Sequence, residues 1–327
     1  MISIVIPIYN EEENLDVLYT RLTNAAPAWG DTYEVVLVND GSKDRSAFMM
    51  REIAEKDEHF RIVTFSRNFG HQAAISAGIQ AARGDAVVIM DGDLQDPPEE
   101  LPRFLEKWRE GYDVVYAVRT KRKENFFKKI AYKTFYRVLG MISDIDIPLD
   151  SGDFCVMDRK VVDTLVKEMP EKSRFVRGLR AYAGYKQIGV KYERAERNAG
   201  EVKYTFKKLV KLALDGIFDF STFPLKLATY IGFIIAIPSF LAGIFFIVHR
   251  ILDFEILGYS PSDTPGLATL AVGMFFLGGI MLIIMGILGE YLGRIYYEVK
   301  QRPFYVVDNI YNSREEAERL RHAEEKV

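Results

Sequence analysis

The stretch Val87-Val88-Ile89-Met90-Asp91-Gly92-Asp93-Leu94-Gln95-Asp96-Pro97-Pro98 decides the fold class. Its opening apolar run is typical of a strand buried on both faces, as in a parallel sheet. Two aspartates follow the run, and in open α/β sheets ligands bind beyond the carboxyl ends of the strands. Asp91 and Asp93 therefore suit one hard cation, Mg²⁺ or Mn²⁺, shared with substrate phosphates. An ordinary strand-ending turn is the alternative, because Asp and Gly are common turn residues.

Similar apolar runs alternate with helical patterns along the first 200 residues. Strands are predicted at 3–8, 34–38, 61–65, 113–117 and 188–192. Helices are predicted from about 11 to 22, from 43 to 57, from 73 to 82 and from 160 to 168. This alternation implies βαβ units with right-handed crossovers. We therefore expect an α/β, Rossmann-like domain with a mostly parallel sheet over residues 1–202.

The last third of the chain carries two long apolar segments, at about 228–248 and 267–289. Each has about the 20 residues that cross about 30 Å of hydrocarbon, so two transmembrane helices are predicted within 227–292. A basic and apolar segment at 203–226 is typical of an amphipathic helix in the membrane interface. Basic residues flank the pair of spans, which places both termini and the tail at 293–327 in the cytosol. No basic region precedes the first apolar run, so no signal peptide is expected.

The composition excludes several classes of function. The net charge of −3 gives no electrostatic case for nucleic-acid binding. The single cysteine, Cys155, excludes an intrachain disulfide and a multi-cysteine metal site. Neither Gly-x-Gly-x-x-Gly after the first strand nor a P-loop motif is found, which argues against a dinucleotide oxidoreductase and a P-loop NTPase. The histidines have no metal-ligand spacing and are interpreted as structural or exposed; they are His59, His71, His249 and His322.

Four loops are expected at the carboxyl edge of the sheet, at 7–11, 39–42, 66–70 and 91–95. Acids at the ends of the first two strands suit the hydroxyl and ring N–H groups of a nucleotide. A metal-held diphosphate without a P-loop indicates a nucleotide whose diphosphate is the leaving group. Asp153, in a non-repetitive stretch, could act as a general base for an acceptor or could orient it. Basic residues near the membrane segments suit an acceptor phosphate or anionic lipid; they are Arg119, Lys129, Lys133, Arg197 and Lys203.

Several motifs in combination resemble glycosyltransferase family 2. They are Ser3-Ile4-Val5-Ile6-Pro7-Ile8-Tyr9-Asn10-Glu11-Glu12, Val38-Asn39-Asp40-Gly41-Ser42 and Asp91-Gly92-Asp93-Leu94-Gln95-Asp96-Pro97-Pro98-Glu99. Two further motifs are Ser151-Gly152-Asp153-Phe154 and Gly289-Glu290-Tyr291-Leu292-Gly293-Arg294. With the two apolar spans, they make nearly the whole chain similar to polyprenyl-phosphate glycosyltransferases of the bactoprenol glucosyltransferase type, which are related to dolichol-phosphate mannose synthase.

This resemblance implies a GT-A fold and an inverting, metal-dependent transfer of one sugar to undecaprenyl phosphate, with UDP-glucose as the expected donor. It implies Mg²⁺ or Mn²⁺ at Asp91, Asp93 and Gln95, and catalytic roles for Asp153, Asp93 and Arg197. The nucleotide sugar would lie against Pro7, Tyr9, Asn10, Glu11, Asp40, Ser42, Gly70, Asp91 and Gly92. The acceptor phosphate would lie against Arg119, Lys129, Lys133 and Lys203.

The resemblance also implies a setting for the reaction. We expect a multi-pass protein of the bacterial cytoplasmic membrane with a cytosolic catalytic domain, assembled as a homo-oligomer, a tetramer by family analogy. Its product would be a lipid-linked sugar for modification of cell-envelope glycans. Because a phosphate acceptor is already ionised at neutral pH, Asp153 is expected to orient substrate or stabilise charge rather than to take a proton.

Two departures from the family pattern and three alternatives accompany this interpretation. Gly92 stands where the family often has alanine, a change expected to be harmless, and Val202 stands where it often has threonine, which removes a hydroxyl on the acceptor side. The same reaction could use GlcNAc, mannose or an aminoarabinose derivative. A processive synthase would usually carry Gln-x-x-Arg-Trp, which is not found. A non-catalytic membrane scaffold that binds nucleotide sugar is the alternative from another class.

Overall fold

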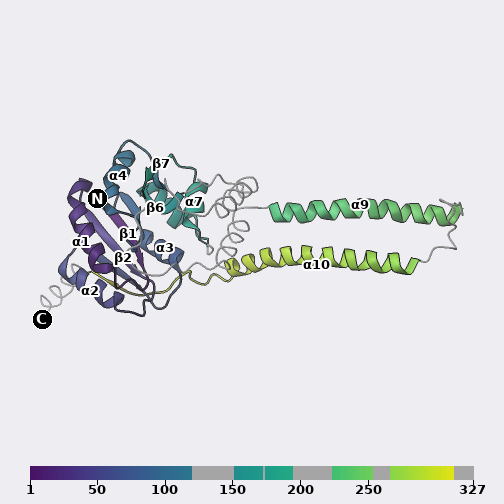
Figure 1. Cartoon of the computed structure of the whole chain (residues 1–327), viewed down its shortest axis with the longest axis horizontal. Helices are drawn as coiled ribbons and strands as arrows, with labels where there is room; N and C mark the ends of the chain where they lie inside the picture. The colour runs from purple at the N-terminus through teal and green to yellow at the C-terminus, as the bar shows by residue number, and fades with distance from the viewer. Residues whose placement is uncertain (120–150, 172–173, 194–222, 253–265, 313–327) are drawn as a thin grey trace. The chain divides into compact units, whose positions relative to one another are not determined.

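The computed structural model describes residues 1–119, 151–171, 174–193, 223–252 and 266–312. They belong to two compact units, each described here by itself. The first unit contains every strand of the described chain, including the segment 301–312 that follows the last long helix. The second unit contains the long helices α9 (Phe223–Leu252) and α10 (Gly266–Val299) (Figure 1).

The first unit is built on one sheet with the strand order β7-β5-β6-β4-β1-β2-β3-β8. Strand β1 pairs in parallel with β2 and β4, β2 with β3, and β5 with β7. Strand β6 is antiparallel between β4 and β5, and β8 is antiparallel to β3. The strand bounds are Ile2–Ile8, Tyr33–Asn39, Phe60–Phe65, Ala86–Ile89, Val114–Arg119, Ser151–Asp158, Gln187–Tyr192 and Val307–Tyr311 for β1 to β8. The predicted α/β class and mostly parallel sheet are confirmed.

Helices cover both faces of this sheet, which explains why β1 is apolar at most of its positions and buried at all of them. Ile4 and Ile6 pack in a core with Leu18 and Trp29, on the side of α1 (Leu15–Ala25), α2 (Ser46–Lys56) and α4 (Leu101–Arg109). The opposite face is covered by α3 (His71–Ala81), α6 (Arg159–Asp163) and α7 (Val176–Tyr182). Two short 3-10 helices, η1 (Ala26–Trp29) and η2 (Pro98–Glu100), and one turn of π-helix, η3 (Thr164–Glu168), complete the described helices of the unit.

Strands β6 and β8 correct the sequence-based predictions. Asp153 was expected in a non-repetitive stretch, but it lies within β6, whose polar first residues conceal the alternation of inward Phe154 and Val156. Residues 307–311 were expected in a juxtamembrane tail and instead form β8. This edge strand has largely exposed side chains, so its sequence carries no buried-strand pattern, and backbone pairing with β3 holds it.

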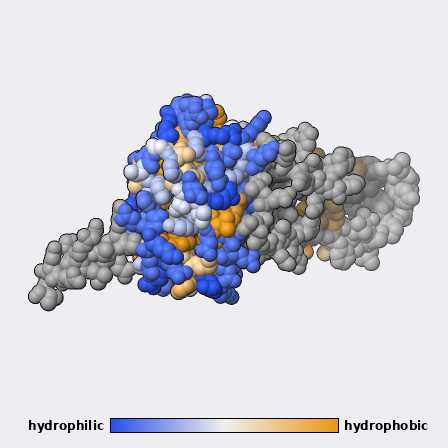
Figure 2. Space-filling model, turned by 60° about the vertical axis from the view of Figure 1, so that its left-hand side comes forward, coloured by the Kyte–Doolittle hydropathy of each residue, from blue (hydrophilic) through white to orange (hydrophobic). Residues whose placement is uncertain are grey.

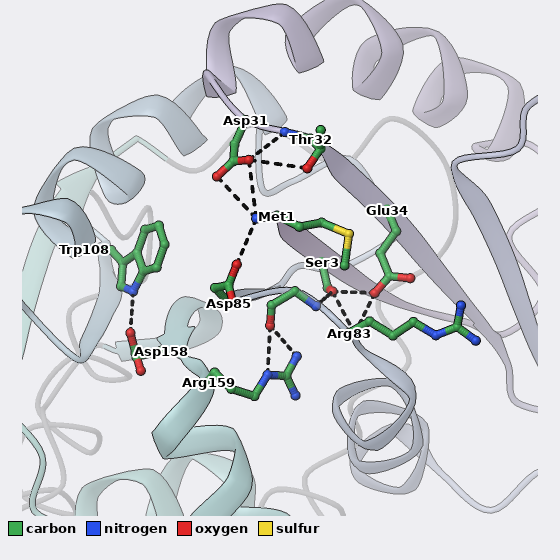
Figure 3. Close-up of polar contacts among 11 residues, drawn as sticks. Met1, Ser3, Asp31, Thr32, Glu34, Arg83, Asp85, Trp108, Asp158 and Arg159 are labelled. Atoms are coloured by element: carbon green, nitrogen blue, oxygen red, sulfur yellow. Dashed lines mark hydrogen bonds and ion pairs between the residues drawn. The ribbon is translucent and has the colours of Figure 1, made fainter.

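Hydrogen bonds and ion pairs hold the amino edge of the sheet, where the parallel strands begin, and Figure 3 shows several of them. Ser3 Oγ donates to Glu34 Oε1 at 2.5 Å, and the backbone N–H of Arg83 donates to the same oxygen at 2.7 Å. The guanidinium of Arg61 binds Glu34 Oε2 at 3.0 Å, and both side chains are about nine-tenths buried. Arg159 Nε donates to the carbonyl oxygen of Gly84 at 2.8 Å, which ties α6 to the start of β4.

Helices α9 and α10 contain the two apolar segments at 228–248 and 267–289. By length and composition, one part of the described chain could cross a membrane, Phe276–Val299, and Pro224–Ser239 forms a shorter apolar stretch. Large apolar side chains of α10 such as Leu282 and Ile283 are about two-thirds exposed. The face of the first unit in Figure 2 is mostly hydrophilic by comparison. Both predicted spans, at 228–248 and 267–289, stay predictions, and most of the predicted interface helix at 203–226 lies outside the described residues.

Candidate functional site

Two strand-end loops at the carboxyl edge are joined by side-chain hydrogen bonds. The backbone N–H of Asn10 donates to Ser42 Oγ at 3.2 Å, and Asn10 Oδ1 accepts from the N–H of Lys43 at 2.8 Å. The N–H of Glu11 donates to Ser46 Oγ at 2.9 Å. Asn10 has φ 55°, in the left-handed region that Asn tolerates better than most residues. The structure thus brings the predicted residues Asn10, Glu11 and Ser42 together, next to Pro7 at the end of β1 and to Tyr9.

Asp40 organises the third loop, at 66–70. Its buried carboxylate accepts from the N–H of Phe69 at 2.7 Å, from the N–H of Gly70 at 3.0 Å and from Asn68 Nδ2 at 2.8 Å. Burial raises the pKa of Asp40 above its usual value, although these hydrogen bonds favour the ionised form. At Gly41, which has φ 66°, a Cβ would come within 2.5 Å of the loop backbone. These hydrogen bonds of Asp40 hold the loop, and its contact with a nucleoside stays a prediction.

The stretch that follows β4 presents Asp91, Asp93 and Asp96 within one loop. Leu94 has φ 63°, a conformation that costs of order 1–3 kcal/mol in a residue with a branched side chain. The Leu94 side chain is buried in the core cluster, which holds this turn in place. Asp93 Oδ1 accepts from the N–H of Gln95 at 3.1 Å, and Tyr192 Oη donates to Asp96 Oδ1 at 2.6 Å. The strained turn therefore fixes the acids in a small volume at the end of a buried strand.

His71 links this loop to Asp153 of β6. Its Nε2 lies 3.6 Å from Asp91 Oδ1 and 3.5 Å from Asp153 Oδ2. The other oxygen of Asp153 is 3.2 Å from Arg177 Nη2, on α7. His71 was interpreted as structural or exposed, and its side chain is 45% exposed; its contact with two acids was not predicted. Its position directly after Gly70, in a loop expected at the same sheet edge, was the signal that could have found it. Arg177 was also missed, because α7 has no motif that marks it.

The charges of these side chains shift one another's ionisation. Burial raises the pKa of Asp91 to about 7; His71 opposes the shift, and the charges of Asp96, Asp153 and Asp93 add to it. Burial alone would raise the pKa of Asp153, but Arg177 and His71 hold the pKa of that carboxyl well below its usual range. Burial disfavours the imidazolium of His71, yet Asp153, Asp91 and Asp40 raise its pKa to about 9. Asp153 is consequently a fixed anion and a very weak base.

The donor set fits a hard divalent cation that is shared with a substrate. Carboxylate oxygens are the ligands that Mg²⁺ and Mn²⁺ prefer, and the mutual repulsion that raises the pKa of Asp91 is what a cation would relieve. Within the described residues, no three acidic, histidine or cysteine side chains converge as a complete metal cage. Asp91 and Asp93 would hold the cation only with help from a diphosphate and water, which is how Mg²⁺ is usually bound in nucleotide enzymes.

The predicted acceptor side is described in part. Arg119 is the last residue of β5, in register with Tyr192 of β7. Lys129, Lys133, Arg197 and Lys203 lie outside the described residues, so their roles stay predictions. Gly92 approaches β1 closely, because a Cβ there would lie 2.6 Å from Ile8 Cδ1, the far end of a flexible side chain.

Residues 3–166 match the sequence pattern described as Glycosyl transferase family 2, and they include β1, the acidic loop after β4 and Asp153. The chain belongs to glycosyltransferase family 2. Its family is therefore one of glycosyltransferases, and its mostly parallel sheet is GT-A-like.

Relatives of this glycosyltransferase match it over nearly its full length. An uncharacterized glycosyltransferase of Bacillus subtilis, YkcC, is 50% identical over 94% of both chains. A prophage bactoprenol glucosyl transferase homolog of Escherichia coli is 40% identical, over 94% of this chain and 99% of the relative. Among solved structures, a Mycobacterium tuberculosis glucosyl-3-phosphoglycerate synthase with Mn²⁺, UDP-glucose and phosphoglyceric acid is 18% identical, covers 67% of this chain and 77% of its own, and has a TM-score of 0.46.

Proposed function

We propose that this glycosyltransferase moves one sugar, glucose from UDP-glucose, to undecaprenyl phosphate with inversion. The observation that carries the proposal is Asp153, which is held as an anion by Arg177 and His71 within 3.5 Å and lies beside the acids of the loop after β4. The relatives named bactoprenol glucosyl transferase support the lipid-phosphate acceptor and the glucosyl donor. The same site chemistry would also serve a GlcNAc, mannose or aminoarabinose donor.

The donor would bind over the loops after β1, β2, β3 and β4. Asp91, Asp93 and Gln95 would hold Mg²⁺ or Mn²⁺, which when bound neutralises the charge that develops on the leaving diphosphate. Pro7, Tyr9, Asn10, Glu11, Ser42, Gly70 and Gly92 would lie along the nucleotide sugar, with Asp40 keeping the loop at 66–70 in place. Hydrogen bonds already connect most of these loops, so little ordering would be required when the donor binds.

Asp153 would stabilise positive charge on the reacting sugar rather than accept a proton from the acceptor. Glycosyl transfer passes through a transition state with positive character on the sugar ring, and a fixed anion near the ring stabilises it. The acceptor phosphate is already ionised near neutral pH, so it needs no general base. Arg119, Lys129, Lys133 and Lys203 would bind that phosphate, together with Arg197, and the phosphate oxygen would attack opposite the leaving diphosphate.

The membrane completes the proposal, because the acceptor is a lipid. We place α9 and α10 as two spans of the bacterial cytoplasmic membrane, the segment 203–226 in its interface, and the catalytic unit with both termini in the cytosol. The apolar and largely exposed surface of α10 supports this placement. A homo-oligomer, a tetramer by family analogy, and a role in cell-envelope glycan modification belong to the same proposal.

A radiolabelled-sugar transfer assay tests the function directly. Purified full-length protein is incubated with undecaprenyl phosphate, Mg²⁺ or Mn²⁺, and a panel of UDP-, GDP- and dTDP-sugars. We expect an organic-extractable product from UDP-glucose that EDTA abolishes. Asp93→Asn should lose the product, and Glu99→Gln, an exposed partner of Arg21 in the same segment, should retain it. Binding of a donor without lipid-linked product from any of them would favour the non-catalytic scaffold.

A further inference from the structure

The imidazole of His71 lies where a cation would be expected between two acids. Nε2 is almost equidistant from Asp91 Oδ1 at 3.6 Å and Asp153 Oδ2 at 3.5 Å. These acids come from the loop after β4 and from β6, while His71 begins α3, so three elements meet at the ring. Arg177 already compensates the other oxygen of Asp153 at 3.2 Å. The ring therefore lies between one acid that also pairs with Arg177 and a second acid, Asp91, that follows β4.

The ring is partly accessible to solvent. The His71 side chain is 45% exposed, while Asp91 and Asp153 are 27% and 17% exposed. Both distances are longer than an optimal charged hydrogen bond of about 2.7–2.9 Å, so the ring is attracted by both acids without being locked to either. His71 is the first residue of α3, so a change of side-chain rotamer, and not of the backbone, is the movement that would take the ring out of the site.

We propose that His71 is a positioning residue that holds Asp91 and Asp153 in place of the divalent cation, and that it leaves Asp91 when the cation enters with the nucleotide sugar. The inference rests on the proposed function, because it takes Asp91 as a ligand of that cation. A divalent ion and the ring would compete for the same side of Asp91, because Nε2 already lies 3.6 Å from Asp91 Oδ1.

The inference predicts an effect opposite to that of an ordinary site mutation. A residue that competes with the metal weakens metal binding, so its removal should tighten the binding of Mn²⁺ in the absence of nucleotide. Transfer should nevertheless become slower, because Asp153 loses one of its two cationic partners and its position relative to Asp91 is less defined. A purely structural histidine would leave metal affinity unchanged, and a metal ligand would weaken it when removed.

The affinity for Mn²⁺ can be measured without any turnover, from the electron paramagnetic resonance signal of the free ion. Full-length protein in detergent is titrated with Mn²⁺, comparing wild type with His71→Gln, and with His71→Ala to show that the result does not depend on the glutamine. His59→Gln is the matched control, because His59 pairs with Asp57 at 2.7 Å, is 42% exposed and stacks on Tyr33 away from the site. We expect both His71 variants to bind Mn²⁺ about five- to tenfold more tightly than wild type, and the control to match wild type.

Other outcomes separate the role of His71 from the metal site itself. Unchanged or weaker Mn²⁺ binding by both His71 variants, with wild type binding normally, would overturn the role of His71 alone. Wild-type protein that binds no Mn²⁺ even with UDP-glucose would instead overturn the metal site of the proposed function, and this inference with it. Asp93→Asn separates the cases, because it should abolish binding only where the metal site is the assigned one.

Discussion

The two edges of the central sheet differ in whether their buried acids are paired with positive charge. At the amino edge, Glu34 is paired with Arg61 at 3.0 Å and accepts two further hydrogen bonds, so its charge is fully compensated. At the carboxyl edge, burial raises the pKa of Asp91, and the negative charges of neighbouring acids raise it further. These acids belong to the loop after β4 and to β6. Compensated charge supports the fold, whereas clustered acids lower its stability and provide a site for a cation. The difference predicts which mutations affect stability and which affect activity.

The largest expected effect is the loss of activity in Asp91→Asn. Removing this carboxylate should lower transfer by about a thousandfold, of the order seen when a preorganised electrostatic group is lost. Stability should not fall: an acid with a pKa raised from 3.8 to about 7 destabilises the fold as the pH rises through that interval, and asparagine removes this effect at neutral pH. Thermal unfolding and the transfer assay on the same preparation check both. A lower unfolding temperature would show that Asp91 is a structural acid.

Glu34→Gln should have the converse effect, a large loss of stability with little change in activity. It leaves the guanidinium of Arg61 buried without its charge partner, which costs roughly 3–5 kcal/mol of unfolding free energy. Turnover per folded molecule should stay within about twofold of wild type, because Glu34 lies at the edge opposite the site. The unfolding temperature should fall by about 6–20 °C for a unit of this size. An Arg61→Met, Glu34→Met double variant should recover much of the loss; an equally unstable double variant would argue against charge pairing as the cause.

Gly41→Ala should have an intermediate effect on both properties. The position has φ 66°, and a Cβ would lie 2.5 Å from the backbone of Arg67 and Asn68, so the loop at 66–70 must shift. We expect a loss of about 1–3 kcal/mol of stability and weaker binding of nucleotide, measured by calorimetry with UDP. Gly111→Ala is a control, because Gly111 has φ 90° with no atom near the added carbon. If UDP affinity were unchanged in Gly41→Ala, this loop would not belong to the nucleotide site.

Gly92→Ala should have the smallest effect, although Gly92 lies between two acids of the site. The added carbon meets only the terminal Cδ1 of Ile8 closely, and a rotamer change of that side chain relieves the contact. We expect transfer within about threefold of wild type and stability within about 1 kcal/mol. The same two assays measure this variant. A large loss would mean that the backbone at Gly92 itself approaches the substrate.

Sequence patterns predicted the parts of this molecule that depend on local periodicity. The runs before Asn10, Asp40 and Asp91 became β1, β2 and β4 because buried parallel strands are apolar on both faces. Strand β6 escaped prediction because its first residues are polar and its pairing partners are distant in sequence. His71 and Arg177 escaped for the same reason: their importance comes from the carboxylates opposite them, which only the tertiary fold brings near.

Strand β8 determines which residues a fragment of the catalytic unit must include. Ile310 pairs with Val63, the ring of Tyr305 stacks on Phe65 at 5.0 Å, and the carbonyl of Val306 accepts from the N–H of Ser66 at 3.1 Å. The two long helices are therefore an insertion between parts of one catalytic unit. A fragment that ends before α9 would strip β3 of its neighbour, leaving an unpaired strand edge that invites aggregation. It would also remove the hydrogen bond between Ser66 and Val306, at the start of the loop that Asp40 holds. A soluble catalytic fragment should replace the helices by a linker and retain residues 301–312.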